Sequence, residues 1–206
     1  MKLKNTINAA LRFMKGLQRP SKRANLRRMR ERGDTMDSFT IREATVEDIA
    51  ALAALHVKTW METYPEVRQP PTFYIREYQW RQQFESADNN WFCYVVQDRQ
   101  GKLVGFSKGQ PYNHSDLPMF SGEINKIYLL QEYHRLGLGK RLLCTVVRRF
   151  VSQGINSVLL FGESSNPSGY FHEAMGAKKI FNKKGGFDGG YGWYDLQQIS
   201  SICSIT

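Results

Sequence analysis

The chain has 206 residues, of which 41% are hydrophobic and 13% aromatic, which excludes a disordered chain, and no window approaches the roughly 18 unbroken apolar residues of a transmembrane helix. The formal net charge of +10 favours nucleic acid or an anionic membrane as a partner until the position of that charge is considered. Residues 1–38 contain eleven basic and three acidic residues, a net charge of +8, and only +2 remains on residues 39–206, so the basicity belongs to an N-terminal extension.

This extension, residues 1–38, divides at Pro20. Before Pro20, apolar residues recur at helical spacing among basic ones, which predicts a basic amphipathic helix. A run of charged residues follows between Lys22 and Arg32. In other proteins such segments bind a membrane surface or a partner, or act as transit peptides. We interpret this one as a solvated tail, partly helical or disordered, or as an upstream extension with Met36 as the biological start.

Three cysteines, Cys93, Cys144 and Cys203, lie far apart along the chain and are odd in number. Their spacing matches neither a zinc site nor a disulfide framework. We therefore expect no metal, small buried or surface side chains at these positions, and a reducing, cytoplasmic location.

The domain predicted for residues 39–199 begins with a short strand at 39–42. Thr45 followed by Asp48 is typical of a helix N-cap with an acidic third position. The first helix is predicted to run from Ile49 and to end before Pro65, and a second helix is predicted across residues 73–84. We expect its inner side to consist of Phe73, Tyr74, Tyr78 and Phe84.

Residues 98–101 have the signature of a hairpin turn between two strands, at 91–96 and 103–107. A glycine-rich turn at 185–190 separates the last two strands. The order of elements predicts an α+β fold with a mixed sheet and one parallel crossover, and residues 200–206 form a C-terminal tail. The remaining predicted elements are a strand at 123–130, a helix from 138 to about 154, a strand at 158–161, a short helix that ends at Gly176, and closing strands at 177–181 and 191–199.

A strand at 123–130 runs into a turn with glycines two residues apart, and the turn opens a helix. The first amides of a helix have no partner inside it and carry the positive end of its dipole. Gly137 and Gly139 allow the backbone to come close to a bulky anion, and Arg135, Lys140 and Arg141 add positive charge nearby. The turn at residues 134–139 therefore predicts a phosphate-binding site.

Two common phosphate motifs are excluded by single residues. A P-loop requires glycine where this chain has His134, and Ser or Thr where it has Arg141. A dinucleotide-binding turn requires a third glycine where this chain has Leu142. The turn is therefore expected to bind a phosphate-bearing ligand other than a nucleoside triphosphate or a dinucleotide.

From residue 39 to about residue 196 the sequence resembles the GNAT superfamily of N-acetyltransferases. The resemblance rests on residues 132–139 (EYHRLGLG), where His134 replaces the usual Gln or Arg, on residues 41–49 (IREATVEDI), and on residues 166–177 (NPSGYFHEAMGA). It implies a GNAT-like α+β fold with a mixed, mostly antiparallel twisted sheet, helices on both faces and a V-shaped acyl-CoA cleft. The alternative is an unrelated α+β protein with a chance turn.

The resemblance further implies that acetyl-CoA, the acyl donor, lies in a V between the fourth and fifth strands. Its pyrophosphate would meet the amides of residues 136–140, and the backbone of Ile127 and Leu129 would pair with the pantetheine arm like an added strand. Asn166 matches a position that helps to hold the cofactor, although an Asn-Pro pair is also a simple helix-start signal. The expected cofactor-binding residues are Ile127, Tyr128, Leu129, His134, Arg135, Leu136, Gly137, Leu138, Gly139, Lys140 and Asn166.

Direct attack on the thioester requires a base, an oxyanion donor and an acid. Glu123, at the start of the fourth strand, is the expected base, with an ordinary strand-end carboxylate as the alternative. The family-like oxyanion donor is the amide of Leu129. For the acid, His172 stands where relatives usually carry Tyr, and Tyr170 lies on a different helical face, so the choice between them, or neither, stays open.

The sequence therefore predicts an N-acetyltransferase that moves an acetyl group from acetyl-CoA to a primary amine of a small molecule or peptide in a ternary complex. One alternative is a non-catalytic acyl-CoA-binding module, and another is a protein whose basic arm binds RNA or membrane. We expect no specific nucleic acid partner and leave a homodimer open. The loops expected beside the acceptor, at 65–73, 110–122 and 185–190, carry aromatic residues and few charges and give no preference among acceptors.

Overall fold

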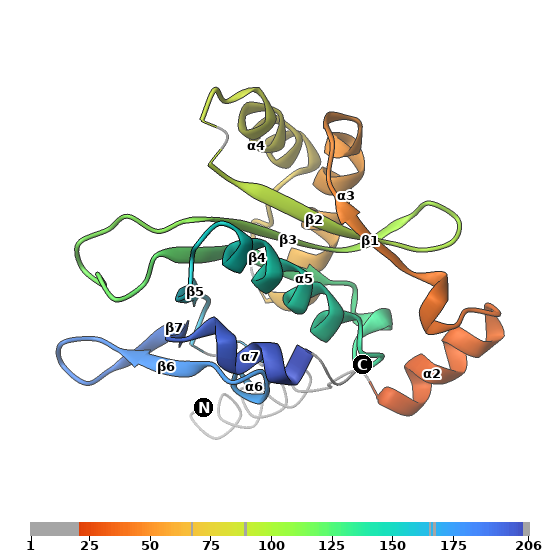
Figure 1. Ribbon diagram of the computed structural model, residues 1–206. Coiled ribbons are helices and arrows are strands. Elements are labelled where there is room, and N and C mark those ends of the chain that lie inside the picture. Colours follow the sequence, from red (N-terminus) through yellow and green to blue (C-terminus); the bar gives the residue numbers. More distant parts are fainter. Residues whose placement is uncertain (1–20, 67, 89, 165, 167, 204–206) are drawn as a thin grey trace, which may run out of the picture.

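The computed structural model describes residues 21–66, 68–88, 90–164, 166 and 168–203 (Figure 1). The amphipathic helix predicted before Pro20 lies outside these residues. In the described part of the chain, seven strands form one sheet in the order β1-β2-β3-β4-β5-β7-β6. Their bounds are β1 Thr40–Glu43, β2 Phe92–Gln97, β3 Leu103–Pro111, β4 Gly122–Leu129, β5 Val158–Phe161, β6 Lys178–Phe181 and β7 Phe187–Trp193.

Neighbouring strands pair antiparallel except β4 and β5, which pair parallel. A parallel pair needs a crossover, and here it is the long helix α5, Leu138–Ser152. The predicted α+β fold with a mixed, mostly antiparallel sheet and one parallel crossover is confirmed.

Helices cover both faces of the sheet (Figure 1). On one face, His56 of α3 packs against Phe106 of β3, and on the other, Phe150 of α5 packs against Phe92 of β2. No helix in the described ranges is long and apolar enough to cross a membrane. The other helices are α2 Lys22–Glu31, α3 Ile49–Thr63, α4 Phe73–Glu85, α6 Gly169–Ala174 and α7 Leu196–Cys203, with short 3-10 turns η1 Met36–Ser38, η2 Val46–Asp48 and η3 Gln131–Tyr133.

The predicted N-cap at Thr45 is confirmed, and it begins η2, which leads into α3. The Thr45 amide donates to the Asp48 carboxylate at 2.9 Å, and Arg42 of β1 donates two hydrogen bonds to the same carboxylate at 2.7 and 2.8 Å. This arrangement fixes the start of α3 against the first strand.

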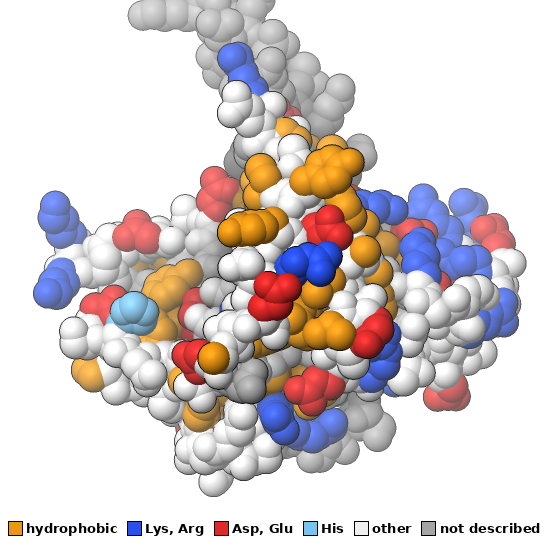
Figure 2. Space-filling view, turned by 90° about the horizontal axis from the view of Figure 1, so that it is seen from above, with side chains coloured by type: hydrophobic (Ala, Val, Ile, Leu, Met, Phe, Trp, Pro, Cys, Tyr) orange, Lys and Arg blue, Asp and Glu red, His pale blue; other side chains and the backbone are white. Residues whose placement is uncertain are grey.

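The predicted inner side of α4 is partly wrong. Tyr74 is 79% and Tyr78 65% exposed, whereas Trp80, which the sequence analysis did not name, is buried. Positions 73, 77, 80 and 84 share one helical face, and Tyr74 and Tyr78 lie about one residue, roughly 100°, away from it. Figure 2 looks down on α3 and α4 and shows hydrophobic side chains at this surface, with charged residues among them.

The last predicted strand, 191–199, is also wrong in its second half. Strand β7 already begins at Phe187, inside the predicted glycine-rich turn, and ends at Trp193, and residues from Leu196 onward form α7. Glycine is needed in this strand because neighbouring atoms occupy the space of a Cβ, the backbone of Gly162 at Gly189 and the Phe120 ring at Gly192.

The expectation about the cysteines is corrected as well. Cys144 of α5 and Cys203 of α7 form a disulfide across 59 residues of sequence, and Cys93 is buried and unpaired. Helix α7 packs on α5, which brings the two thiols together although their spacing in the sequence gives no sign of it. The cytoplasmic location rested partly on unpaired cysteines and stays a prediction without that support.

Residues 21–38 are not a solvated tail. Asn25 of α2 has no exposed surface, and its side-chain amide donates to the carbonyl oxygens of Gln131 and His134 at 2.8 and 3.0 Å. Met29 of α2 joins the main hydrophobic core, and Arg32 pairs with Glu132 at 3.1 Å. Helix α2 therefore packs on the segment that links β4 to α5.

Candidate functional site

Strands β4 and β5 separate soon after they meet. Their register contains only Gly122 with Val158 and Glu123 with Leu159, although β4 continues to Leu129. Among the described residues, 124–129 therefore have a strand partner on the β3 side alone, and we call their other side the unpaired β4 edge. This separation is the V-shaped feature that the resemblance implied.

The backbone groups on the unpaired β4 edge can be assigned. The amide of Leu130 donates to the Val104 carbonyl of β3 at 2.9 Å. Because alternate residues of a strand direct their amide and carbonyl groups to opposite sides, those of Ile127 and Leu129 point away from β3. Two residues predicted to pair with an extended ligand thus present backbone groups to the unpaired edge.

A β-bulge in β4 sets which side chains share a face. Lys126 pairs with Lys108 and Ile124 with Gly109, so Asn125 is the extra residue. Side chains alternate along a regular strand, so Glu123 and Lys126 would otherwise lie on opposite faces. With the bulge, both lie on the face covered by α3 and α4.

The segment between β4 and α5 has the shape expected of a phosphate site. Gly137 is the N-cap of α5 with φ +90°, a left-handed conformation that suits glycine, and Arg135 also has positive φ at 64°. Helix geometry leaves the amides of the first turn, from Leu138 on, without partners inside the helix. An added Cβ on Gly139 would lie 3.4 Å from the Phe171 ring, an ordinary van der Waals contact, so this position lies beside α6. The turn places helix amides and their dipole beside the end of β4.

Not all of the predicted positive charge faces this turn. The guanidinium of Arg141 donates to the carbonyl oxygens of Met36 and Phe39 at 2.8 and 3.1 Å. It therefore holds the segment between α2 and β1. Arg135 is exposed and Lys140 is half-buried.

His134 contacts the backbone of β4 directly. Its Nε2 lies 2.6 Å from the Leu129 carbonyl oxygen, which only accepts, so Nε2 carries the proton and donates it. Burial lowers the pKa of His134 below its ordinary value. A neutral imidazole thus fixes the Leu129 carbonyl at the end of the unpaired β4 edge.

The predicted base, Glu123, is held by two side-chain amides. Gln110 donates to one carboxylate oxygen at 2.8 Å, and Asn125 donates to the other at 3.2 Å. The Gln110 oxygen in turn accepts from Lys108 at 2.8 Å. Both bonds are donated to Glu123, so each of its carboxylate oxygens serves as an acceptor.

The two predicted acids of α6 lie in opposite surroundings. His172 is 3% exposed and packs against the rings of Tyr191 and Trp193, and burial lowers its pKa to about 4. Tyr170 is 63% exposed. A neutral, enclosed His172 is a poor proton source at pH 7, and both assignments stay predictions.

Asn166 lies next to the end of α3. Its amide donates to the hydroxyl of Tyr64 at 3.3 Å, and its oxygen accepts from the Ser168 amide at 2.9 Å. Burial is the main cause that raises the pKa of Tyr128 to about 12, and the charge of Tyr64 and a hydrogen bond with Tyr64 also raise it. Two tyrosine hydroxyls therefore connect Asn166 to β4, and the sequence analysis gave neither hydroxyl a role.

Sequence reasoning also missed the basic side chains beside Glu123. Lys108, Lys126 and Arg76 are wholly or partly buried, and burial is the main cause that lowers the pKa of each. Lys108 gave a usable signal, because it interrupts an otherwise uncharged strand. Arg76 gave none, because an arginine on an amphipathic helix is ordinarily solvated.

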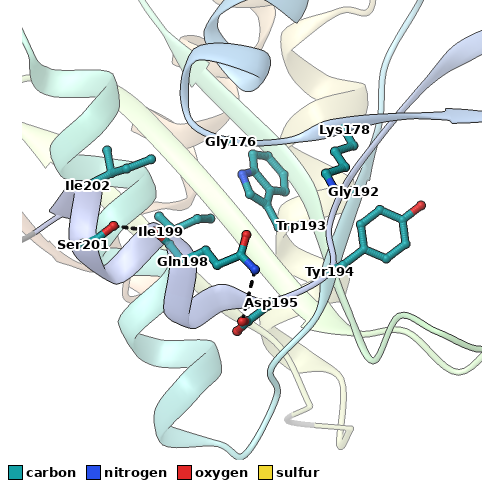
Figure 3. Close-up of a pocket in the computed structure, with 10 residues that line it drawn as sticks. All are labelled: Gly176, Lys178, Gly192, Trp193, Tyr194, Asp195, Gln198, Ile199, Ser201 and Ile202. Carbon is teal, nitrogen blue, oxygen red and sulfur yellow. Dashed lines mark hydrogen bonds between the residues drawn. The ribbon is translucent and has the colours of Figure 1, made fainter.

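One pocket lies beside Trp193, the residue against which His172 packs (Figure 3). Its volume is about 270 Å³, and it lies between β7, α7 and the residues after α6. The Trp193 indole lines it and donates to the Met175 carbonyl at 2.9 Å. None of the predicted site residues lines it, and we assign it no function.

Residues 52–177 match the sequence profile described as the acetyltransferase (GNAT) family. The chain belongs to this family. It is therefore an N-acetyltransferase, an acyltransferase of the class that acetylates amines.

Individual relatives agree with this assignment. The chain is 30% identical over 175 residues to the uncharacterized N-acetyltransferase YuaI of Bacillus subtilis, covering 79% of this chain and 97% of YuaI. PaiA N-acetyltransferase of Thermoplasma acidophilum, in complex with coenzyme A, has a TM-score of 0.57 at 20% identity over 75% of this chain and 98% of PaiA. A GNAT phosphinothricin acetyltransferase of Sinorhizobium meliloti, in complex with AcCoA, has a TM-score of 0.57 at 21% identity over 75% of this chain and 86% of that enzyme. At these identities the two structures support the fold.

Proposed function

We propose that this enzyme transfers an acetyl group from acetyl-CoA to the primary amine of a small molecule or peptide by direct attack in a ternary complex. The observation that carries the proposal is the juxtaposition of the unpaired β4 edge with the glycine turn at the start of α5. The PaiA and phosphinothricin acetyltransferase structures, whose descriptions name coenzyme A and AcCoA, support the choice of donor.

The residues present fit acetyl-CoA. The left-handed Gly137 and the first turn of α5 would hold its pyrophosphate, with Arg135 and Lys140 near by. Backbone groups of Ile127 would pair with its extended arm, and the Leu129 amide, whose own carbonyl accepts from His134, would face its acetyl end. When bound, acetyl-CoA supplies an activated acetyl thioester.

The chain's own groups then serve the transfer. Glu123 removes a proton from the incoming ammonium group, directly or through water, and the amides of Gln110 and Asn125 hold its carboxylate in place. The Leu129 amide donates to the acetyl oxygen as negative charge develops there. The proton for the departing thiolate comes from His172 or Tyr170, as predicted, or from the linked hydroxyls of Tyr64 and Tyr128. The two hydroxyls are considered because burial lowers the pKa of His172 and makes it a poor proton source.

A CoA-release assay with the full chain tests this function. The acceptor panel contains amino acids, phosphinothricin, polyamines, aryl amines and short peptides, and mass spectrometry identifies each acetylated product. We expect transfer to at least one amine and a fall in kcat of about 100-fold for Glu123→Gln. Full activity in Glu123→Gln would remove the assigned base. Calorimetric binding of acetyl-CoA without transfer to any amine would favour the non-catalytic binding module.

A further inference from the structure

Three basic side chains gather on the sheet face that carries Glu123. Lys108 and Lys126 are cross-strand partners on β3 and β4. Helix α4 covers them, since Gln83 of α4 accepts a hydrogen bond from the Lys108 ammonium at 2.7 Å. Arg76, also on α4, is close enough for its charge to lower the pKa of Lys126. We call Arg76, Lys108 and Lys126 the basic cluster.

No carboxylate in the described part of the chain forms an ion pair with the basic cluster. Their hydrogen-bond partners are neutral amide oxygens, those of Gln83 and Gln110 for Lys108, Asn125 for Lys126 and Gln79 for Arg76. The Nε of Arg76 is buried and has no hydrogen-bond partner at all. The cluster therefore has donor capacity that the protein leaves unused.

The charges in this region do not balance. Three cations face the single carboxylate of Glu123, which is linked to Lys108 through Gln110 and to Lys126 through Asn125. Burial, together with the charges of Lys108 and Arg76, lowers the pKa of Lys126 to about 8. Proteins usually pair charges that they bury, because an unpaired buried charge costs free energy. A ligand that brings negative charge would restore the balance.

We propose that the amine acceptor also bears a carboxylate or another oxyanion, which the basic cluster binds while the amine faces Glu123. This deepens the acetyl transfer proposed above and rests on it. The bulge at Asn125 places the two opposite charges of the site on one face, which suits the two ends of a zwitterion such as an amino acid. Polyamines and lysine-rich peptides would bring a second positive charge to the cluster and are disfavoured.

The basic cluster is separate from the phosphate turn. Lys108 and Lys126 lie on the face covered by α3 and α4, whereas α5, which begins at the turn, packs on the other face through Phe150. Loss of a cluster charge should therefore change the acceptor's kinetics and leave the KM for acetyl-CoA unchanged.

Matched acceptors test the proposal. Each pair consists of an L-amino acid and its carboxamide. The carboxamide keeps the amine and lacks only the negative charge of the carboxylate. We expect kcat/KM by CoA release to favour the better amino acids over their carboxamides by about tenfold or more. Lys126→Met and Arg76→Gln should each reduce that preference at least several-fold. Arg81→Gln, a change of an exposed arginine on the same helix that pairs with Glu77, should keep the preference.

The outcomes separate this proposal from the proposed function. Transfer to amines with equal kcat/KM for acids and carboxamides overturns the anionic acceptor and leaves the acetyl transfer intact. Transfer to no amine refutes the proposed function, and calorimetry with N-acetyl amino acids and their amides in the presence of CoA then decides the inference. Tighter binding of the carboxylate form supports the basic cluster as an anion site, and equal or no binding of either overturns it. Thermal unfolding of each variant identifies one that fails to fold, and the second variant then decides.

Discussion

Asn25 offers the sharpest test of how α2 is attached to the enzyme. The Asn25→Ala change removes two hydrogen bonds, of 2.8 and 3.0 Å, to the carbonyl oxygens of Gln131 and His134. It also removes a bond of 3.3 Å that the exposed Arg28 donates and that water can replace. Asn25 has no exposed surface, so water does not easily replace the lost donors. At about 1 kcal/mol for each bond to a carbonyl oxygen, the loss is about 2 kcal/mol of unfolding free energy. For a chain of this size that corresponds to a fall in Tm of about 4–8 °C.

Urea and thermal unfolding measure this effect, with Arg30→Ala as the matched control. Arg30 is an exposed residue of the same helix, and its replacement should change the stability by less than about 0.5 kcal/mol. Because Asn25 bonds to the segment that leads into the phosphate turn, Asn25→Ala should also raise the KM for acetyl-CoA. An Asn25→Ala protein as stable as Arg30→Ala would refute the reasoning and return α2 to the solvated tail of the sequence analysis.

Three further predictions concern the turn, the basic cluster and the disulfide. Gly137→Ala, at φ +90°, should cost about 1–2 kcal/mol and raise the KM for acetyl-CoA, whereas Gly154→Ala, at φ +77° beyond the other end of α5, should cost a similar amount and leave that KM unchanged. Equal KM values in both would separate the turn from acetyl-CoA binding. The pKa of Lys126 is lowered to about 8 from its ordinary value of 10.5, so the unfolded chain binds more protons between these pH values and the unfolding free energy contributed by Lys126 rises across them. The difference in unfolding free energy between the wild type and Lys126→Met should therefore shift in favour of the wild type between pH 8 and 10. A difference from urea unfolding that stays constant over this pH range would contradict this. A reductant should lower the Tm of the wild type, because it removes a cross-link over 59 residues that contributes about 4 kcal/mol to the unfolding free energy. It should not change the Tm of Cys144→Ser. Alkylation of three thiols in unreduced, unfolded protein would exclude the bond.

Features defined by neighbouring residues were predictable from the sequence. The cap at Thr45 needs only an acidic side chain three residues later, and the turn at Gly137 needs only glycines between a strand and a helix. The mixed, mostly antiparallel sheet with one parallel crossover also followed, because the resemblance covers the segments that form it. These are local signals, or signals shared by a family.

Features that depend on distant contacts were not predictable. The Asn25 side chain bonds to residues more than a hundred positions away, and Cys144 finds Cys203 only because α7 folds onto α5. Glu123 shares a face with the basic cluster only because of the bulge at Asn125, and one unpaired strand residue has no signature in the sequence. The burial of His172 likewise depends on Tyr191 and Trp193, which come later in the chain, on β7.

The bulge at Asn125 divides β4 into two segments that are out of phase with each other. Upstream of it, Glu123 lies on the face covered by α3 and α4, where we propose that the amine reacts. Downstream of it, Ile127 and Leu129 direct their backbone groups to the unpaired β4 edge. The extra residue absorbs the mismatch between these two requirements, which an unbroken alternation does not meet together. A substitution on the Glu123 side of the bulge therefore need not rotate Ile127 and Leu129, so the residues proposed to meet the donor can keep their place while those around the amine change.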